Sequence, residues 1–203
     1  MQIRELSIPD AFEVTPIVRG DDRGAFLEWY RHDVLEEAVG HSLALRQVNA
    51  SVSRRGVLRG VHFADIPLGQ AKYVTVTNGA ILDFVVDLRV GSATFGKWEA
   101  VPLDSTDFHA LYIAEGLGHA FLALTENASV TYLVSDVYRP DREHGVNPLD
   151  PEIGLEFPIG RAELIISPKD LEAPSLSEAR TSGLLPSIDT AHGFYASLAR
   201  KVN

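Results

Sequence analysis

Short runs of β-branched and aromatic residues, separated by turn-forming residues, dominate the centre of the chain. The clearest run is KYVTVTNGAILDFVVDLR, residues 72–89, in which side chains of different polarity alternate on both sides of Asn78-Gly79. Alternation with a period of two is the pattern of a strand with two unequal faces. Asn-Gly between two such strands is typical of a tight hairpin, because both residues tolerate a positive φ. The run therefore predicts two strands joined by a hairpin.

Similar runs recur along the chain and predict an all-β fold. We expect further strands at residues 12–18, 26–31, 43–53, 57–63, 98–103, 110–113, 119–124 and 129–138. Many short strands at this spacing favour a sandwich or a barrel. Helical signals are few: they predict helices at 33–39, at 176–182 and at 189–201, the first two with capping boxes formed by Asp33 with Glu36 and by Ser175 with Glu178. A length of 203 residues without linker or low-complexity tract predicts one domain over 1–203.

The composition excludes several classes of function. A formal net charge of -10 argues against nucleic acid as a partner, because binding its backbone requires clustered Lys and Arg. The absence of cysteine excludes disulfides, thiolate nucleophiles and Cys-based metal sites. No apolar stretch reaches the roughly 18 residues of a membrane span, and the N-terminal segment is too polar for a signal peptide, so we expect no membrane partner and a cytoplasmic protein. A local group of cations still suits a small anionic ligand, and Arg23, Arg59 and Lys72 are candidates.

The segment RRGVLRGVHFADIPLGQAKYV, residues 54–74, places Arg59, His62 and Lys72 close together in sequence. Strict strand alternation directs Arg59 and His62 to opposite faces. Gly60 lies between them and suits a β-bulge that turns both side chains inward. From these residues alone, a strand histidine bonded to a backbone carbonyl is as good an interpretation of His62 as a catalytic group.

Four more polar residues have both a structural and a functional interpretation. His119 follows a Gly-rich turn in YIAEGLGHAFLAL, where a loop histidine is common. Tyr132 and Tyr138 share strand parity, so they either face one cavity or pack with their hydroxyls at a rim. Asp170 ends the string SPKD, where a turn cap is its simplest role.

Six strings together resemble the dTDP-4-dehydrorhamnose 3,5-epimerase family, in the family's order and spacing over nearly the whole chain. They are DDRGAFLEW, QVNASVSRRGVLRGVHF, QAKYV, VVDLRVGSATFG, GLGHAFLAL and SPKD. The resemblance implies a cupin-type jelly-roll β-barrel with a few short peripheral and C-terminal helices, a homodimer with exchanged strands, and no metal or organic cofactor. Metal-binding cupins usually begin their site with two histidines separated by one residue, whereas Phe63 and Ala64 follow His62 here.

The resemblance also implies a catalytic set. His62 is the base, Asp170 orients it, Lys72 stabilises the enolate, and Tyr132 is the acid on the opposite face of the sugar ring. The chemistry is consistent, because a proton beside a ketone is far less acidic than an imidazolium with its pKa of about 6.5, so the enolate oxygen needs a fixed cation. The residues implied for substrate binding are Gln47, Arg59 and Lys169 at the diphosphate, Ser51, His119 and Tyr138 along the sugar and nucleotide, and Arg23, Phe26 and Glu28 in the neighbouring subunit's site.

The implied function is that of an isomerase, which epimerises a dTDP-4-keto-6-deoxyhexose at C3, C5 or both in dTDP-rhamnose or antibiotic-sugar biosynthesis. One string departs from the rhamnose-pathway pattern, since Ala120 follows His119 in GLGHAF where those enzymes usually have glycine. The variant resembles members that make deoxysugars for secondary metabolites, some of which invert one carbon only. Three alternatives stay open: a ketoisomerase of the same barrel type, a non-catalytic sugar-nucleotide-binding barrel, and a metal-dependent oxygenase.

Overall fold

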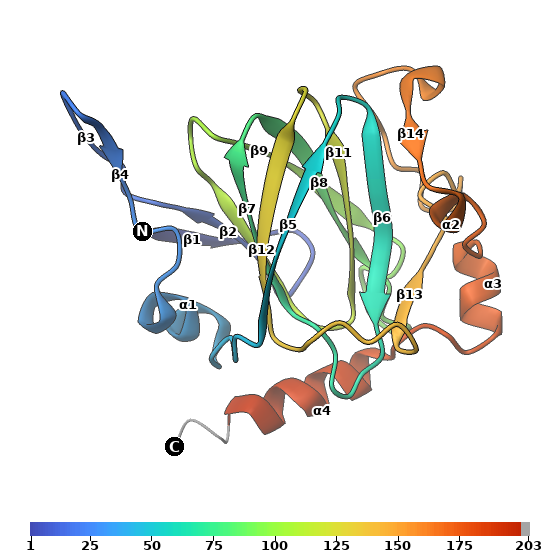
Figure 1. Ribbon diagram of the computed structural model, residues 1–203. Coiled ribbons are helices and arrows are strands. Elements are labelled where there is room, and N and C mark those ends of the chain that lie inside the picture. The colour runs from blue at the N-terminus through green and yellow to red at the C-terminus, as the bar shows by residue number, and fades with distance from the viewer. Residues whose placement is uncertain (200–203) are drawn as a thin grey trace.

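The computed structural model describes residues 1–199, and in it two β-sheets face each other as a barrel (Figure 1). The first sheet contains, in spatial order, β1 (Gln2–Glu5), β2 (Ala11–Thr15), β10 (Ala110–Ile113), β7 (Lys72–Asn78), β12 (Ala128–Val134) and β5 (Gln47–Ser53). The second contains β13 (Glu143–Gly145), β6 (Val57–Ala64), β11 (Leu117–Ala123), β8 (Ala80–Asp87) and β9 (Trp98–Asp104), and β14 (Ile165–Ile166) pairs with β6 in parallel. This arrangement confirms the all-β jelly-roll barrel expected from the sequence.

The predicted hairpin at Asn78-Gly79 is wrong, because β7 and β8 belong to different sheets. Gly79 has a positive φ of 76°, as expected, but Asn78 remains in β7. A Cβ at Gly79 would lie 2.3 Å from the hydroxyl of Thr125, so the glycine permits a close crossing from one sheet to the other. Here the strand that follows β7 in sequence is thus not one of the strands that pair with it.

Several predicted boundaries also differ from the structure. The strand predicted at 26–31 is wrong, because only Phe26 belongs to a strand and residues 27–31 form none. Phe26 ends a short hairpin of β3 (Arg19–Asp21) and β4 (Gly24–Phe26), which projects from the barrel in Figure 1. The strand predicted at 129–138 ends at Val134, and the one predicted at 43–53 begins at Gln47. Beyond Phe26 the chain returns to the barrel, where the Trp29 carbonyl accepts a hydrogen bond from the Tyr73 hydroxyl.

Four α-helices and one 3₁₀ turn lie outside the barrel among the described residues: α1 (His32–Val39), α2 (Pro168–Leu171), α3 (Leu176–Thr181), α4 (Ile188–Ala199) and η1 (Arg161–Glu163). The capping box of Ser175 with Glu178 is confirmed. The box predicted for Asp33 is wrong, because the Asp33 carboxylate accepts from the Arg31 guanidinium at 3.0 Å inside the first turn. The last two residues of the helix predicted at 189–201 lie outside the described residues. No helix within 1–199 is both long and apolar enough to cross a membrane.

Both faces of the second sheet are buried. Val85 and Phe121 point into the space between the sheets, where they join a large apolar cluster. Phe84 and Val86 point the other way and pack with residues of the C-terminal third, such as Leu176 of α3. Because the C-terminal segment covers the outer face, the second sheet needs apolar side chains on both faces.

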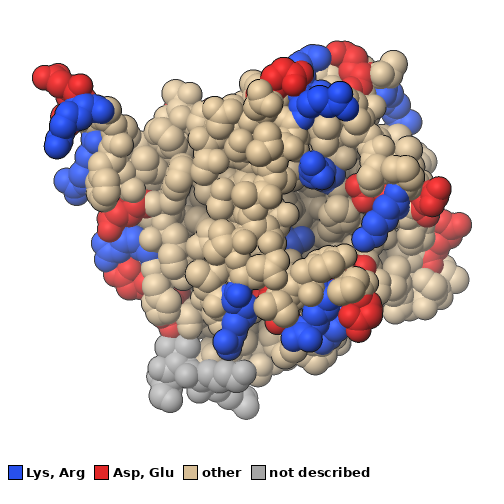
Figure 2. All heavy atoms as spheres, in the orientation of Figure 1, with Lys and Arg blue, Asp and Glu red and all other residues tan. Residues whose placement is uncertain are grey.

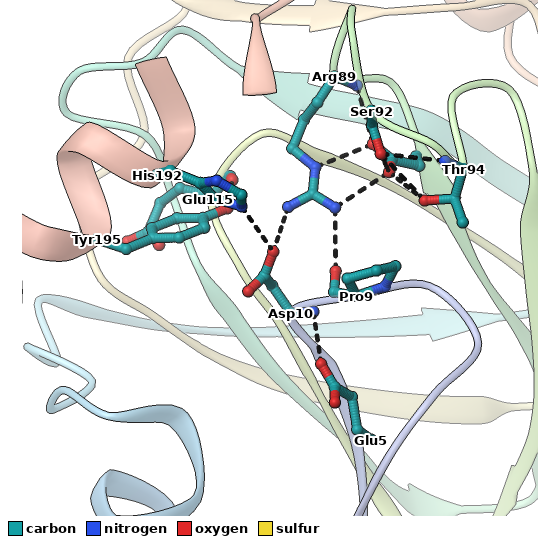
Figure 3. A network of polar contacts seen from close by, with 10 residues as sticks. Glu5, Pro9, Asp10, Arg89, Ser92, Thr94, Glu115, His192 and Tyr195 are labelled. Carbon is teal, nitrogen blue, oxygen red and sulfur yellow. Dashed lines mark hydrogen bonds and ion pairs between the residues drawn. The ribbon is translucent and has the colours of Figure 1, made fainter. Parts of the chain in front are cut away.

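A buried arginine fastens the N-terminal segment to the barrel (Figure 3). The Arg89 guanidinium is fully buried and donates to Asp87 at 2.9 Å, to Asp10 at 2.5 Å and to the Pro9 carbonyl at 3.0 Å. Burial opposes the charge of the arginine, but these acceptors satisfy it, so that its pKa is raised. In Figure 3, Tyr195 of α4 lies beside this network.

Candidate active site

Polar and apolar faces are reversed on β5. Its partly buried side chains Gln47, Asn49 and Ser51 point towards the barrel interior, whereas Val48 and Val52 point outward and are 56% and 64% exposed. The Ser51 hydroxyl is buried and has no hydrogen-bond partner among residues 1–199. An orphaned buried polar atom calls for a ligand or an ordered water. The inner face of β5 is therefore suited to be the wall of a binding pocket.

A β-bulge in β6 directs Arg59 and His62 to the same side. His62 is opposite His119 of β11 and Arg59 is opposite Phe121, so Gly60 and Val61 together face the single residue Ala120. Gly60 has a φ of 118°, and a Cβ there would lie 2.5 Å from the Ala120 side chain. Arg59 also donates to the Ser53 hydroxyl of β5 at 3.2 Å, across the mouth of the barrel. The bulge predicted from Gly60 is confirmed.

His62 is held by a buried carboxylate. Its Nε2 lies 2.7 Å from Oδ1 of Asp170, which is 6% exposed. Ser167 caps α2 and its hydroxyl accepts from the Asp170 amide at 3.1 Å, which fixes the carboxylate over β6. Burial alone would raise the pKa of Asp170, but hydrogen bonds from His62, Ser167 and the Gly60 amide outweigh it, so the pKa is lowered. Asp170 is thus held as an anion that orients the imidazole.

A second histidine–aspartate pair lies beside the first. His119 is opposite His62 in the sheet, and its Nε2 lies 2.9 Å from Oδ2 of Asp83 on β8. Asp83 is fully buried, and its Oδ1 has no hydrogen-bond partner in the described part of the chain. Burial raises the pKa of Asp83, and the His119 imidazole lowers it only in part. Asp83 thus fixes the orientation of the His119 ring, and its Oδ1 is available to accept a further hydrogen bond.

The first sheet forms the opposite wall and carries Lys72 and Tyr132. Tyr132 of β12 is opposite Asn49 of β5 on one side and Val74 of β7 on the other, so it shares the inner face with them. Lys72 is the first residue of β7 and is 8% exposed. A buried ammonium on one wall therefore faces the sheet that carries His62 and His119.

The charge of Glu143 on β13 reaches both Lys72 and Tyr132. Burial lowers the pKa of Lys72, while Glu143 and Asp83 act in the opposite direction. Burial raises the pKa of Tyr132, which the charge of Arg59 reduces and that of Glu143 increases. Two residues after Glu143, Gly145 pairs with His62 in the second sheet. Glu143 thus lies near Lys72 and Tyr132, on the short strand that pairs with the part of β6 that carries His62.

A cleft of about 380 Å³ reaches His62 from the surface, and its lining includes Arg59, Lys169 and Asp170. On the face shown in Figure 2, basic atoms lie at the rim and inside a hollow. Lys169 is exposed at this cleft, one residue before Asp170. Cations beside a cleft of this kind are suited to a phosphorylated ligand.

Other residues expected at the site lie elsewhere in this chain. Arg23, Phe26 and Glu28 are exposed on or just after the β3–β4 hairpin, and Arg23 pairs with Asp21 at 2.5 Å. Tyr138 lies beyond the end of β12 and is 55% exposed, so its predicted strand parity with Tyr132 does not apply. Its amide donates to the Gln47 side chain at 3.0 Å, which still places its backbone beside the pocket wall.

Three polar residues of the pocket escaped the sequence analysis. Asp83 is a charged residue between apolar neighbours in ILDFVV, and Asn49 alternates with valine and alanine in QVNASVS. Both patterns show which residues share a face but not which face is inside. Glu143 has no such signal, because β13 is only three residues long. Within 1–199, no three His, Asp or Glu side chains group as a metal site, and the expected absence of a metal stays a prediction.

The chain is similar to characterised epimerases over its whole length. A family model described as dTDP-4-dehydrorhamnose 3,5-epimerase matches residues 5–178. A dTDP-4-dehydrorhamnose 3,5-epimerase of Mycolicibacterium smegmatis is 52% identical over 202 residues, which cover 100% of this chain and 99% of that protein. A dTDP-4-dehydrorhamnose 3-epimerase of Streptomyces niveus is 51% identical over 94% of this chain and 91% of its own.

Solved structures agree with the sequence relatives. The Mycobacterium tuberculosis rmlC epimerase superposes with a TM-score of 0.95 at 46% identity, covering 98% of this chain and 100% of that chain. ChmJ, a 3'-monoepimerase from Streptomyces bikiniensis in complex with dTDP-quinovose, gives a TM-score of 0.93 at 45% identity, covering 96% and 98%. Both double and single epimerases are therefore among the chains that this protein resembles.

Proposed function

This chain belongs to the dTDP-4-dehydrorhamnose 3,5-epimerase family, and we propose that it inverts C3, C5 or both of a dTDP-4-keto-6-deoxyhexose. The reaction class is that of an isomerase, in which a proton is removed beside the ketone and returned to the opposite face. The observation that carries the proposal is the His62–Asp170 contact of 2.7 Å on one sheet of the barrel, while the other sheet carries the buried Lys72. These steps move protons only, so they need no redox cofactor, and we propose that Lys72 supplies the positive charge that a metal would otherwise provide at the enolate oxygen.

His62 is the proposed base. Asp170 accepts a hydrogen bond from Nε2, which leaves Nδ1 with the lone pair that removes the proton. When the imidazole becomes positive, the ionised carboxylate stabilises it. The lowered pKa of Asp170 supports this role, because it keeps the carboxylate ionised at neutral pH.

Lys72 is the proposed partner of the enolate oxygen. Loss of the proton places negative charge on the former ketone oxygen, and a fixed cation in a dry site stabilises such charge by about 3 to 4 kcal/mol. The pKa of Lys72 is lowered, because the effect of burial is only partly offset by the charges of Glu143 and Asp83. The negative charge that develops on the substrate oxygen favours the protonated form of the lysine.

Tyr132 is the proposed acid. Inversion requires a donor on the face of the ring away from the base, and Tyr132 is on the sheet opposite to the one that carries His62. Its raised pKa keeps the phenol protonated at neutral pH, so it enters the reaction as a donor.

The remaining polar groups are proposed to bind the sugar nucleotide. Arg59 and Lys169 line the cleft that leads to His62, where their charges suit the diphosphate. Gln47 and Ser51 on β5, His119 on β11 and the exposed ring of Tyr138 are proposed to line the sugar and nucleotide positions. The unpartnered hydroxyl of Ser51 supports its place in this set.

We further propose a homodimer in which exchanged strands complete the site. Phe26 on the projecting hairpin is 67% exposed, and the apolar outer face of β5 is exposed at Val48 and Val52. Apolar patches of this kind on an edge strand and a projecting arm suit a second copy of the chain. Arg23, Phe26 and Glu28 then extend into the pocket of the neighbouring subunit.

Proton exchange in heavy water tests the proposal directly. Enzyme and dTDP-4-keto-6-deoxyhexose are incubated in D₂O, and the signals of H3 and H5 are followed by NMR. Deuterium uptake at C3, C5 or both supports the mechanism and shows which carbon is inverted. Without uptake at either carbon, epimerisation by this route is eliminated.

Two variants assign the roles. His62→Ala is expected to abolish exchange, and Tyr132→Phe is expected to slow product formation more than exchange. Near-wild-type rates in both variants would reject these assignments. Identification of the product by NMR separates epimerisation from the alternative ketoisomerase, which moves the carbonyl instead of inverting a centre.

A further inference from the structure

Lys72 lies at the very end of a strand, because it is the first residue of β7. Its neighbours in the sheet are Ile113 of β10 and Val134 of β12, which are near the ends of their own strands. Strand ends tend to fray, yet a cation that stabilises an oxyanion has to be held within a few tenths of an ångström. Some additional contact is needed to fix the backbone at this end of the sheet.

Ser135 supplies the first part of that contact. It directly follows β12, and its hydroxyl accepts a hydrogen bond from the Ala71 amide at 2.8 Å. Its own amide donates to the Ala71 carbonyl at 3.1 Å. Both backbone groups of the residue before Lys72 are therefore bonded to one serine.

Glu115 supplies the second part. The Ser135 hydroxyl donates to Oε1 of Glu115 at 2.9 Å, and Glu115 lies two residues after the end of β10. The contacts Ala71–Ser135–Glu115 thus join the ends of β7, β12 and β10, the three adjacent strands around Lys72.

Glu115 is itself fixed from several sides. It is 2% exposed, and a Cβ at Gly69 would lie 2.5 Å from its Cγ, so the loop before β7 packs closely on its side chain. Its carbonyl accepts from the Tyr195 hydroxyl of α4 at 2.5 Å, at the edge of the Arg89 network in Figure 3. The carboxyl group therefore has little freedom to move away from Ser135.

We propose that Glu115 and Ser135 are positioning residues, which clamp the start of β7 so that the Lys72 ammonium meets the enolate oxygen. Neither residue touches the substrate; both act through the backbone of Ala71. The inference rests on the proposed role of Lys72. It predicts that substitutions which break the contact between Ser135 and Glu115 slow proton removal without a matching loss in nucleotide binding.

The first test compares Ser135→Thr with Ser135→Val, which have the same shape and differ in one hydroxyl. The valine variant leaves the Ala71 amide and the Glu115 carboxyl without their partner, and small displacements of reacting groups lower rates by up to about 100-fold. We expect the deuterium exchange rate to fall about 10- to 100-fold for valine and to stay within about threefold of wild type for threonine. Both variants should bind dTDP within about twofold of wild type.

The second test makes the same comparison at Glu115. Glu115→Gln keeps a carbonyl oxygen for the Ser135 hydroxyl, whereas Glu115→Met removes it at similar size. Because burial raises the pKa of Glu115, the neutral glutamine is the better tolerated change. Glutamine should retain exchange, methionine should lose about 10-fold or more, and the Ser135→Val/Glu115→Met double variant should be close to Ser135→Val alone.

Lys72→Met separates this inference from the proposed function. Wild-type exchange in Lys72→Met would remove the role of Lys72 and with it the mechanism. If Lys72→Met loses exchange while the valine and threonine variants have equal rates, the clamp alone is overturned. The clamp is also overturned if dTDP affinity falls in proportion to the exchange rate. The same holds if circular dichroism shows that both Ser135→Val and Glu115→Met fail to fold, since the two side chains would then serve the fold in general.

Discussion

Replacing Asp170 with asparagine removes the negative charge beside His62 and leaves the shape of the side chain nearly unchanged. In the wild type the two side chains are 2.7 Å apart and the carboxylate is almost completely buried. A hydrogen bond to a charged group contributes about 1.5 to 3 kcal/mol and a neutral one about 0.5 to 1.5 kcal/mol. The substitution should therefore remove about 1 to 2 kcal/mol of support for the positive imidazole that forms during proton removal.

At 1.36 kcal/mol for each factor of ten, this loss corresponds to a decrease of about 5- to 30-fold in the exchange rate. The assay is deuterium uptake at C3 and C5 under saturating substrate, with dTDP binding measured in parallel. Glu172→Gln is the matched control, because it removes one exposed carboxylate just after α2 without approaching His62. The reasoning is refuted if Asp170→Asn exchanges within twofold of wild type, or if the control loses as much.

Three further substitutions test other parts of the structure. Gly60→Ala should lower the exchange rate by at least 10-fold and the unfolding free energy in urea by about 1 to 3 kcal/mol, because the new Cβ would lie 2.5 Å from Ala120. The control Gly193→Ala should have neither effect, because no atom lies within 4 Å of its new Cβ. Burial raises the pKa of Asp83 in the folded state, so the folded protein binds a proton that the unfolded chain releases above about pH 4. The difference in unfolding free energy between wild type and Asp83→Asn should therefore decrease as the pH rises from about 4 through the raised pKa. A difference that stays constant or increases would contradict the assignment. Val52→Asp should reduce the mass in light scattering from twice the chain mass of 22.2 kDa to a single chain, and an unchanged mass would reject the outer face of β5 as the dimer contact.

Local signals in the sequence predicted local structure well. Strict alternation would place Arg59 and His62 on opposite faces of the strand, and the glycine between them indicated a bulge that brings both to one face. The structure has this bulge at Gly60. The capping box of Ser175 follows from four consecutive residues and is present. In both cases the residues that decide the geometry are neighbours in sequence, so one chain segment contains all the information.

Asn78-Gly79 failed as a hairpin signal for the opposite reason. The sequence shows that a glycine is required after β7, but not what the chain passes there, and the nearest obstacle is Thr125 in a turn 46 residues away. Asp83 is a similar case. Its partner His119 is 36 residues along the chain, and only the pairing of β8 with β11 brings the two together.

The resemblance to the epimerase family supplied the proposed reacting residues, but it did not explain why β5 has the pattern QVNASVS. Alternation alone assigns Gln47, Asn49 and Ser51 to one face and Val48 and Val52 to the other, and an isolated barrel would place the valines inside. The structure places them outside, an arrangement that a ligand at the polar face and a covering surface at the apolar face would both stabilise. Pocket and proposed dimer contact are thus two faces of one strand, so a change that releases the partner from Val52 should also loosen the pocket wall at Ser51.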